Sequence, residues 1–449
     1  MRRVGALYLI LLACEFALLA VIFTQRTLIL NDPSEYSVAW TDTWGGQYRD
    51  YSYDAVFSGD ALFVTGASYS YGPGPINLLL MKYSGDGELI WNQTYWEGGY
   101  AMGRGLATDG ASVYVSGIHI DEDAAYSLLQ KYDQDGGLIW SREWRPGPDA
   151  KASGVAMDTA GNIYVTGYVI ESETENRGFL LKYTDNGDLL FSKVFEANGT
   201  ETDWGLSVGD AVYVCGEVTH NTTILEETGV PTASMLLRKV SLDGVVMWSR
   251  ETSIGLDNVA NSVDSAGEVV VAGYVSYTNG TSRDVLLRYS GDGDLKSTKM
   301  LGVSALGDMA WGVTQAGAYS YVVGHARPDF TDLSDLSVYK LGPDGGVLWE
   351  NYYSDYSIDG ARAVTVHGDD VYVVGETYWR TLDMQVLVVK LVSPNVALPP
   401  EVSHALTLSP IAVGTLLLGV ALYRMARFRR ASSRTGDSGT PSGLKAPEA

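Results

Sequence analysis

The chain has 449 residues, including 51 glycines and 29 tyrosines, and a formal net charge of −23. Such an acidic chain lacks the basic face that phosphate contacts need, which excludes a role in binding DNA or RNA. Glycine, tyrosine and short apolar runs, rather than long helical patterns, favour strands joined by tight turns.

The N-terminus carries Arg2 and Arg3, followed by an apolar run from Val4 to Phe23. A charged start before an apolar run of this length is typical of a secretory signal or a signal-anchor helix. We therefore expect residues 1–30 to form one of these two, and the sequence leaves cleavage open.

From residue 35 onward the chain repeats one unit. Each copy contains an apolar strand that ends in glycine, and these glycines are separated by 49 to 57 residues. Such a period is typical of propeller blades. The seven glycines are Gly66, Gly117, Gly167, Gly216, Gly273, Gly324 and Gly375.

Two further strands follow in six of the copies. The first contains a Lys or Arg, and an Asp-Gly or Asn-Gly turn joins it to the second, which is a strong hairpin signal. A short strand also precedes each glycine-ended strand, so a unit contains four strands and must stack on its neighbours to bury its faces. We predict that residues 35–392 form an all-β, seven-bladed β-propeller of four-stranded antiparallel blades.

The seventh copy lacks its last strand, and a matching strand stands before the first copy. The stretch Glu35–Trp40 aligns with the strand that contains Trp91. We therefore expect the N-terminal strand to complete the last blade, which closes the ring and leaves no open sheet edge.

The stretch Gly161-Asn-Ile-Tyr-Val-Thr-Gly-Tyr168 and the apolar-Lys-Tyr strand after it resemble the SBBP type of β-propeller repeat. The resemblance covers about residues 35–392. It implies a seven-bladed propeller in an extracellular protein, and it implies no particular activity. The chain departs from the usual repeat in the loops after the glycine-ended strands, which differ from blade to blade.

The turns of a four-stranded antiparallel blade alternate between two faces. The Asp-Gly turns lie on the short-turn face, whereas the connections after the glycine-ended strands and between blades lie on the long-loop face. Variable loops on a rigid scaffold often carry binding residues, so we predict binding at the long-loop face. The candidate acidic residues there are Asp121, Glu122, Asp123, Glu171, Glu173, Glu175, Asp329, Asp332 and Asp335.

Clustered carboxylates of this kind would suit Ca²⁺, but none of these runs has the full spacing of a Ca²⁺ loop. Solvated carboxylates are therefore favoured over Ca²⁺, and no cofactor or metal site is assigned. Four sequons in the predicted outer domain are candidate glycosylation sites: Asn92, Asn198, Asn221 and Asn279.

The sequence shows no catalytic constellation. It has five histidines and no H-E-x-x-H or G-x-S-x-G motif. The tryptophans after the Asp-Gly turns resemble the docking strands of quinoprotein dehydrogenases, but packing between blades is the favoured interpretation. The two cysteines, Cys14 and Cys215, predict no disulfide, and Cys215 is expected to be a small buried residue.

After a linker at 393–404, a second apolar run extends from Ala405 to Tyr423 and is followed by four arginines. We expect residues 405–423 to span a membrane and 424–449 to form a basic, then disordered, cytoplasmic tail. Both termini would be cytoplasmic if the first helix is uncleaved, with the propeller outside the cytoplasm. A C-terminal sorting signal is similar in pattern, and the plain anchor is favoured over it.

Three functions follow from these features. The first is a cell-surface, membrane-anchored propeller that binds a glycan, a peptide or an envelope protein through its long-loop face. The second is an extracytoplasmic enzyme, quinone-dependent or glycosidase-like, which would need a funnel at the ring axis lined with cofactor contacts. A cluster of arginine, carboxylate and tyrosine at the axis would favour this enzyme, whereas apolar and small residues there would favour binding. The third is a structural envelope protein without a small ligand.

Overall fold

The computed structural model describes residues 36–122, 124–172, 174–196, 199–224, 231–302, 307–327, 334–353, 358–378 and 383–393. The predicted apolar segments at 1–30 and 405–423, with the linker and tail, lie outside these residues. Within the described residues, no helix is long and apolar enough to cross a bilayer.

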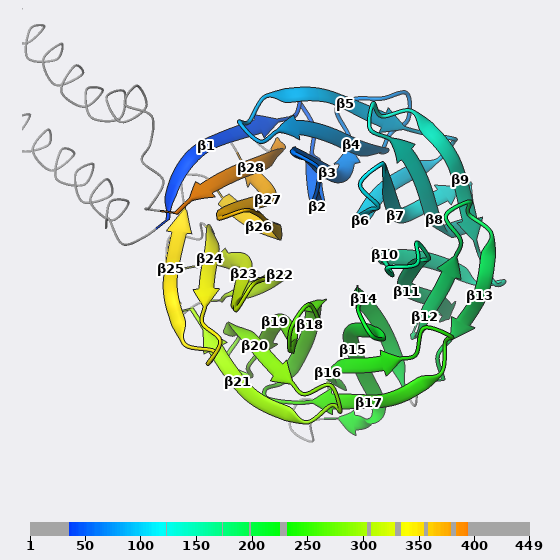
Figure 1. Cartoon of the computed structure of the whole chain (residues 1–449). Helices are drawn as coiled ribbons and strands as arrows, with labels where there is room; N and C mark the ends of the chain where they lie inside the picture. Colours follow the sequence, from blue (N-terminus) through cyan, green and yellow to red (C-terminus); the bar gives the residue numbers. More distant parts are fainter. Residues whose placement is uncertain are drawn as a thin grey trace, which may run out of the picture. The chain divides into compact units, whose positions relative to one another are not determined.

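The described residues form seven four-stranded antiparallel sheets arranged as blades around an axis (Figure 1). The predicted seven-bladed, all-β propeller is therefore confirmed. We number the blades 1 to 7 by their innermost strands, which are β2 (Asp50–Ser58), β6 (Tyr100–Thr108), β10 (Asp149–Met157), β14 (Thr200–Val208), β18 (Asp257–Asp264), β22 (Met309–Ala316) and β26 (Ile358–His367).

The remaining strands follow outward in each blade. The second strands are β3 (Ala61–Ser68), β7 (Ser112–Asp121), β11 (Ile163–Ser172), β15 (Val212–Ile224), β19 (Val269–Ser276), β23 (Tyr319–Ala326) and β27 (Asp370–Tyr378). The third strands are β4 (Asn77–Ser84), β8 (Ala124–Asp133), β12 (Glu175–Tyr183), β16 (Pro231–Val240), β20 (Ser282–Tyr289), β24 (Asp335–Leu341) and β28 (Met384–Val392). The outer strands are β5 (Leu89–Tyr95), β9 (Leu138–Trp144), β13 (Leu189–Val194), β17 (Val246–Thr252), β21 (Leu295–Leu301), β25 (Val347–Tyr353) and β1 (Ser37–Trp44).

The N-terminal strand closes the ring, as predicted. Strand β1 pairs antiparallel with β28, and Trp40 lies opposite Lys390. Trp91 lies opposite Lys82 in the same way in blade 1, so the aligned tryptophans occupy equivalent positions. Strand pairing, rather than a loop, therefore joins the first described strand to the last.

Several connections predicted as long loops are instead strand extensions. Strands β7 and β8 remain paired as far as Asp121 and Ala124, and β11 and β12 as far as Ser172 and Glu175. The long-loop face therefore carries protruding hairpins at blades 2 and 3. Blade 1 has a longer connection, from Ser68 to Asn77.

The core consists of apolar layers between neighbouring blades. Each of seven buried clusters contains residues of two adjacent blades, including one cluster that joins blade 7 to blade 1. Cys215 lies in the cluster of blades 4 and 5 as a buried free thiol, as predicted. Apolar burial, the main favourable term in folding, is thus distributed around the whole ring.

A cation on the third strand of each blade clamps the next blade. The Lys or Arg side chain donates a hydrogen bond to the following blade, and apart from the Lys131–Asp185 contact the distances are 2.8 to 3.3 Å. The cations are Lys82, Lys131, Lys182, Lys239, Arg288, Lys340 and Lys390.

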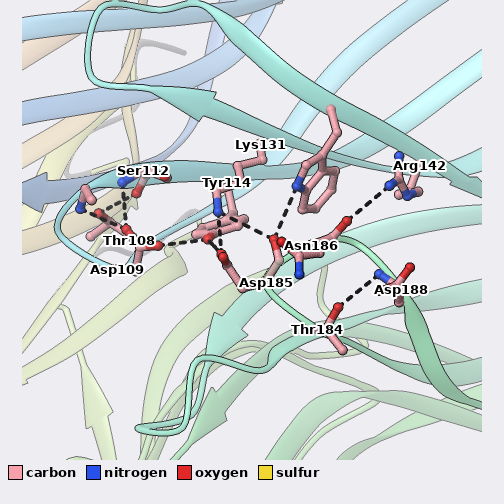
Figure 2. Close-up of polar contacts among 12 residues, drawn as sticks. Thr108, Asp109, Ser112, Tyr114, Lys131, Arg142, Thr184, Asp185, Asn186 and Asp188 are labelled. Carbon is pink, nitrogen blue, oxygen red and sulfur yellow. Dashed lines mark hydrogen bonds and ion pairs between the residues drawn. The ribbon is translucent and has the colours of Figure 1, made fainter.

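Figure 2 shows this clamp between blades 2 and 3, where Lys131 and Tyr114 both point at Asp185. Trp140 donates its indole N–H to the Asp185 carbonyl at 3.2 Å, and Arg142 donates to the Gly187 carbonyl at 2.9 Å. The outer tryptophans therefore pack between blades, as the favoured interpretation predicts.

The seven repeat glycines lie opposite β-bulges in the innermost strands. In each blade one extra residue interrupts the pairing of the first strand with the second. A Cβ atom on any of these glycines would lie 1.7 to 2.3 Å from a carbonyl oxygen of the innermost strand. Only glycine permits this approach, so the repeat motif encodes the bulge.

We predict that Gly167→Ala destabilises the propeller strongly. The new Cβ would lie 2.0 Å from the Lys151 carbonyl oxygen, so the bulge of blade 3 must shift. Chemical denaturation should show a loss of about 3 kcal/mol or more in the free energy of unfolding. Gly209→Ala is the control, because its Cβ would meet nothing closer than 3.5 Å. Equal effects of the two substitutions would contradict the role of the bulge.

We predict that Lys131→Met weakens the clamp between blades 2 and 3. The side chain is largely buried, but Asp185 is half exposed, so the expected loss is about 1–2 kcal/mol in the free energy of unfolding. Lys299→Met, at an exposed position on β21, should change it by less than about 0.5 kcal/mol. A Lys131→Met variant as stable as the parent chain would show that the clamp contributes nothing.

Candidate ligand-binding site at the ring axis

The bulged residues of the seven innermost strands surround a cavity at the axis. This axial cavity has a volume of about 300 Å³. Its lining includes one bulged, half-buried side chain from every blade. We call these residues the axial ring: Tyr53, Arg104, Ser153, Trp204, Asn261, Trp311 and Arg362.

Small and aliphatic residues form the adjoining wall on the side of the short-turn face. Two positions after the bulge, six of the blades contribute an aliphatic side chain to the lining: Leu106, Val155, Leu206, Val263, Val313 and Val364. The axial cavity therefore has an apolar wall below a ring of aromatic and polar groups, a combination typical of small-ligand sites.

The two arginines of the axial ring differ in their partners. Arg362 donates from Nε and Nη2 to the buried carboxylate of Glu376, with a shortest distance of 2.6 Å. Arg104 has no hydrogen-bond or ion-pair partner among the described residues, and its Nε is buried. Arg104 is therefore the cation of the ring that a ligand would find unpaired.

Each arginine packs on the aromatic ring contributed by the preceding blade. The guanidinium carbon of Arg104 lies 4.3 Å from the ring centre of Tyr53, and that of Arg362 lies 4.3 Å from Trp311. Cation–π attraction of this kind fixes the planes of the guanidinium groups.

A hydrogen bond holds one tryptophan of the axial ring, and an aromatic contact holds the other. Trp311 donates its indole N–H to Nδ1 of His325 at 3.1 Å, and burial lowers the pKa of His325 to about 4. His325 is thus neutral near pH 7 and can accept this bond. Tyr168 lies edge-on to Trp204 with ring centres 5.9 Å apart. The tryptophan planes are therefore oriented before any ligand arrives.

Asp54 brings a carboxyl group to the axial cavity. Its two oxygens accept the backbone N–H groups of Ala55 at 2.8 Å and of Leu106 at 2.7 Å. Although solvent reaches part of the residue, the lining of the axial cavity encloses its carboxyl group. This burial raises the pKa of Asp54 to about 6. The two backbone N–H bonds oppose the shift and leave it incomplete.

The acidic residues predicted from sequence lie away from the axial cavity where the structure describes them. Glu171 pairs with Arg177 across the β11–β12 hairpin at 2.9 Å, and Glu175, on the same strand as Arg177, pairs with it at 3.3 Å. Asp121 ends β7, Glu122 follows it, and Asp335 begins β24. The four other candidates, Asp123, Glu173, Asp329 and Asp332, lie outside the described residues.

No three histidine, cysteine, aspartate or glutamate side chains gather at metal-binding distance within the described part of the chain. The Ca²⁺ interpretation thus has no cluster to rest on among these residues. In blade 3, the described members of the predicted acidic group, Glu171 and Glu175, share Arg177 as their partner.

Two of the four sequon asparagines have described side chains, and both are exposed. Asn92 lies on the outer strand β5, and Asn279 lies in the turn between β19 and β20. Asn221 was expected in a loop but lies within β15, because that hairpin extends further than predicted. Asn198 lies outside the described residues. Glycosylation at these sites stays a prediction.

Sequence reasoning missed the axial ring, although the repeat contains a signal for it. The ring residues stand 12 to 14 positions before the repeat glycines. This position varies among aromatic, cationic and small polar residues while its surroundings repeat. A binding site would be expected at a repeat position of this kind, which keeps its place in the fold while its residue type changes.

No known protein-family model matches the chain, and no curated protein matches it in sequence. Solved structures with a similar fold include puromycin hydrolase, at 14% identity and a TM-score of 0.47 over 72% of this chain. The chain spans about half of that protein, as 50% of it is covered.

Two further similar structures are covered almost completely. The β-propeller domain of the Trilobed protease from Pyrococcus furiosus shares 9% identity at a TM-score of 0.45, with 76% of this chain and 95% of that domain covered. The WD40 domain of Neurospora crassa Pan2 shares 8% sequence identity at a TM-score of 0.40, with 66% of this chain and 90% of that domain covered. Such weak likeness indicates no ligand and no reaction.

We predict that Asp54→Asn changes how stability depends on pH. Because the folded pKa of Asp54 is about 6 and the unfolded value is near 3.8, the folded state binds the extra proton between these values. Asp54 therefore lowers the stability of the parent chain as the pH rises from about 4 to 6. Urea denaturation at pH 4 and pH 7 should show that the free energy of unfolding of the variant, relative to that of the parent chain, is higher at pH 7 than at pH 4. Asp292→Asn, in an exposed turn, is the control, and an identical pH profile for both variants would contradict the assignment.

Proposed function

We propose that the chain is a ligand-binding propeller whose small ligand occupies the axial cavity. The observation that carries this proposal is the axial ring itself. Seven equivalent bulges present seven side chains of five residue types to one cavity. A purely structural ring has no need of such variety, since small apolar residues would close the axis at lower cost in desolvation.

We place the mouth of the site at the long-loop face. Aromatic side chains continue from the axial ring in that direction, and Tyr51 stacks on Tyr53 with ring centres 6.0 Å apart. The opposite wall is aliphatic. The long-loop face thus keeps the binding role expected from sequence, with the contacts moved from the variable loops to the bulges beneath them.

This placement agrees with the predicted membrane anchors. Strand β1 begins and β28 ends at the short-turn face, as the strand order requires. The described chain therefore enters and leaves the propeller at the face opposite the proposed mouth. A cell-surface protein outside the cytoplasm, with a glycan, peptide or envelope component as its partner, remains our proposal for the physiological setting.

A glycosidase-like enzyme is the second candidate, because the axial cavity contains arginines, Tyr53 and a carboxyl group. The described lining offers one carboxyl, Asp54, whereas the usual glycosidase mechanism needs a facing pair. Burial raises the pKa of Tyr53, so its phenol stays protonated and is a poor nucleophile. Binding is therefore favoured over catalysis, and release of nitrophenol from aryl glycosides would overturn that preference.

We predict that Trp204→Ala weakens ligand binding and that Trp96→Ala preserves it. Trp96 is an exposed tryptophan between β5 and β6 on the long-loop face, outside the lining of the axial cavity. A panel of monosaccharides, sugar acids, amino acids and short peptides would be screened by thermal shift against the parent chain. For any compound that binds, Trp204→Ala should raise Kd about tenfold or more, because aromatic contact contributes about 0.5–1.5 kcal/mol beyond its buried area.

The opposite pattern, with binding lost in Trp96→Ala and retained in Trp204→Ala, would assign the site to the variable loops. If no compound in the panel shifts the melting temperature of the parent chain, the axial cavity is not a small-ligand site and the structural function is favoured.

A further inference from the structure

Arg104 is the starting point for the chemistry of the ligand. The charge of Arg362 is already matched by the two contacts to Glu376, whereas no carboxylate of the described residues lies within ion-pair distance of Arg104. A buried guanidinium N–H without a partner costs free energy, and a bound anion would remove that cost.

The surroundings of Arg104 favour a single negative charge on the ligand. Only one guanidinium of the axial ring is unpaired, and Asp54 already brings a carboxyl group to the same cavity. A phosphate would carry close to two charges near neutral pH into this setting, whereas a carboxylate carries one. A planar carboxylate also matches the guanidinium fork through two parallel hydrogen bonds.

The other side chains of the axial ring indicate which groups the rest of the ligand would carry. Trp204 and Trp311 alternate with Ser153 and Asn261 around the axis, and the third aromatic residue, Tyr53, lies between the two arginines. Asn261 donates its amide N–H to the Ala310 carbonyl at 2.7 Å, which leaves its side-chain oxygen as an acceptor for a hydroxyl group. A pyranose ring offers both an apolar C–H face and hydroxyl edges, and so fits this alternation.

The size of the cavity sets the length of the ligand. A volume of about 300 Å³ lies at the lower end of the range for small-ligand sites. It suits one sugar ring. A longer chain would have to leave through the mouth at the long-loop face.

From these observations we propose that the axial cavity binds a carboxylate-bearing pyranose, of the uronic acid type, with its carboxylate on Arg104 and its ring between the aromatic side chains. This inference rests on the proposed function and specifies the ligand class of that same site. An acidic peptide could satisfy Arg104, but it would not use the hydroxyl-binding groups Ser153 and Asn261.

The test is calorimetric titration of the full chain with glucuronate and galacturonate, with glucose and galactose as neutral counterparts and N-acetyl-aspartate amide as the peptide probe. Measurements at pH 5 keep Asp54 largely neutral while the uronates stay ionised. We expect a uronate to bind at least tenfold more tightly than its neutral counterpart. Arg104→Gln should weaken uronate binding at least tenfold, and Arg104→Lys should restore part of it.

Arg145→Gln is the matched control, because Arg145 is exposed at the end of β9 on the same face and the substitution removes the same charge. It should leave uronate binding unchanged, whereas an equal loss in both variants would indicate a general charge effect and overturn the inference. Melting temperatures of all variants establish that they are folded.

The other outcomes separate this inference from the proposed function. If neutral sugars bind as tightly as uronates, or if only the aspartate probe or a different class in the wider panel binds, the uronate inference is wrong while an axial site stands. If neither these probes nor the wider panel binds, both proposals fail.

Discussion

The fold and the candidate site both depend on the absence of a side chain at seven positions. A Cβ atom on any repeat glycine would overlap a carbonyl oxygen of the innermost strand, so only glycine lets that strand bulge toward its neighbour. The bulge then inserts an extra residue at the axis, and that residue lines the cavity. A constraint of backbone packing therefore determines where variable chemistry is presented.

Each blade uses its outer half to contact the next blade and its inner half to present a side chain at the axis. In the outer half, an aromatic residue on the second strand lies opposite the clamping cation, as Tyr114 lies opposite Lys131, and both contact the next blade. Blade 5 has Val270 and Ser297 beside Arg288, yet Arg288 still reaches the Gly342 carbonyl. Because the outer half holds the ring together in every blade, the inner bulge can differ from blade to blade.

The sequence predicted the blade number and the ring closure because both follow from spacing and from turn residues that act locally. The axial ring could not be predicted in this way, since the bulge is a property of pairing between strands and shifts relative to the glycine by a residue or two. The pairing of the acidic loop residues could not be predicted, because it depends on how far each hairpin extends. Glu171 meets Arg177 because the β11–β12 hairpin stays paired almost to its tip.

An anion-binding axis is compatible with a strongly acidic protein because electrostatic interactions between exposed charges are screened over short distances. At an ionic strength of about 0.1 M the screening length is about 10 Å, so carboxylates on the outer rim act weakly on a ligand at the axis. Arg104 lies inside the ring, against Tyr53 and partly shielded from water, where its attraction is screened much less. The local charge at the axis, rather than the net charge of the chain, therefore governs which ligands the cavity favours.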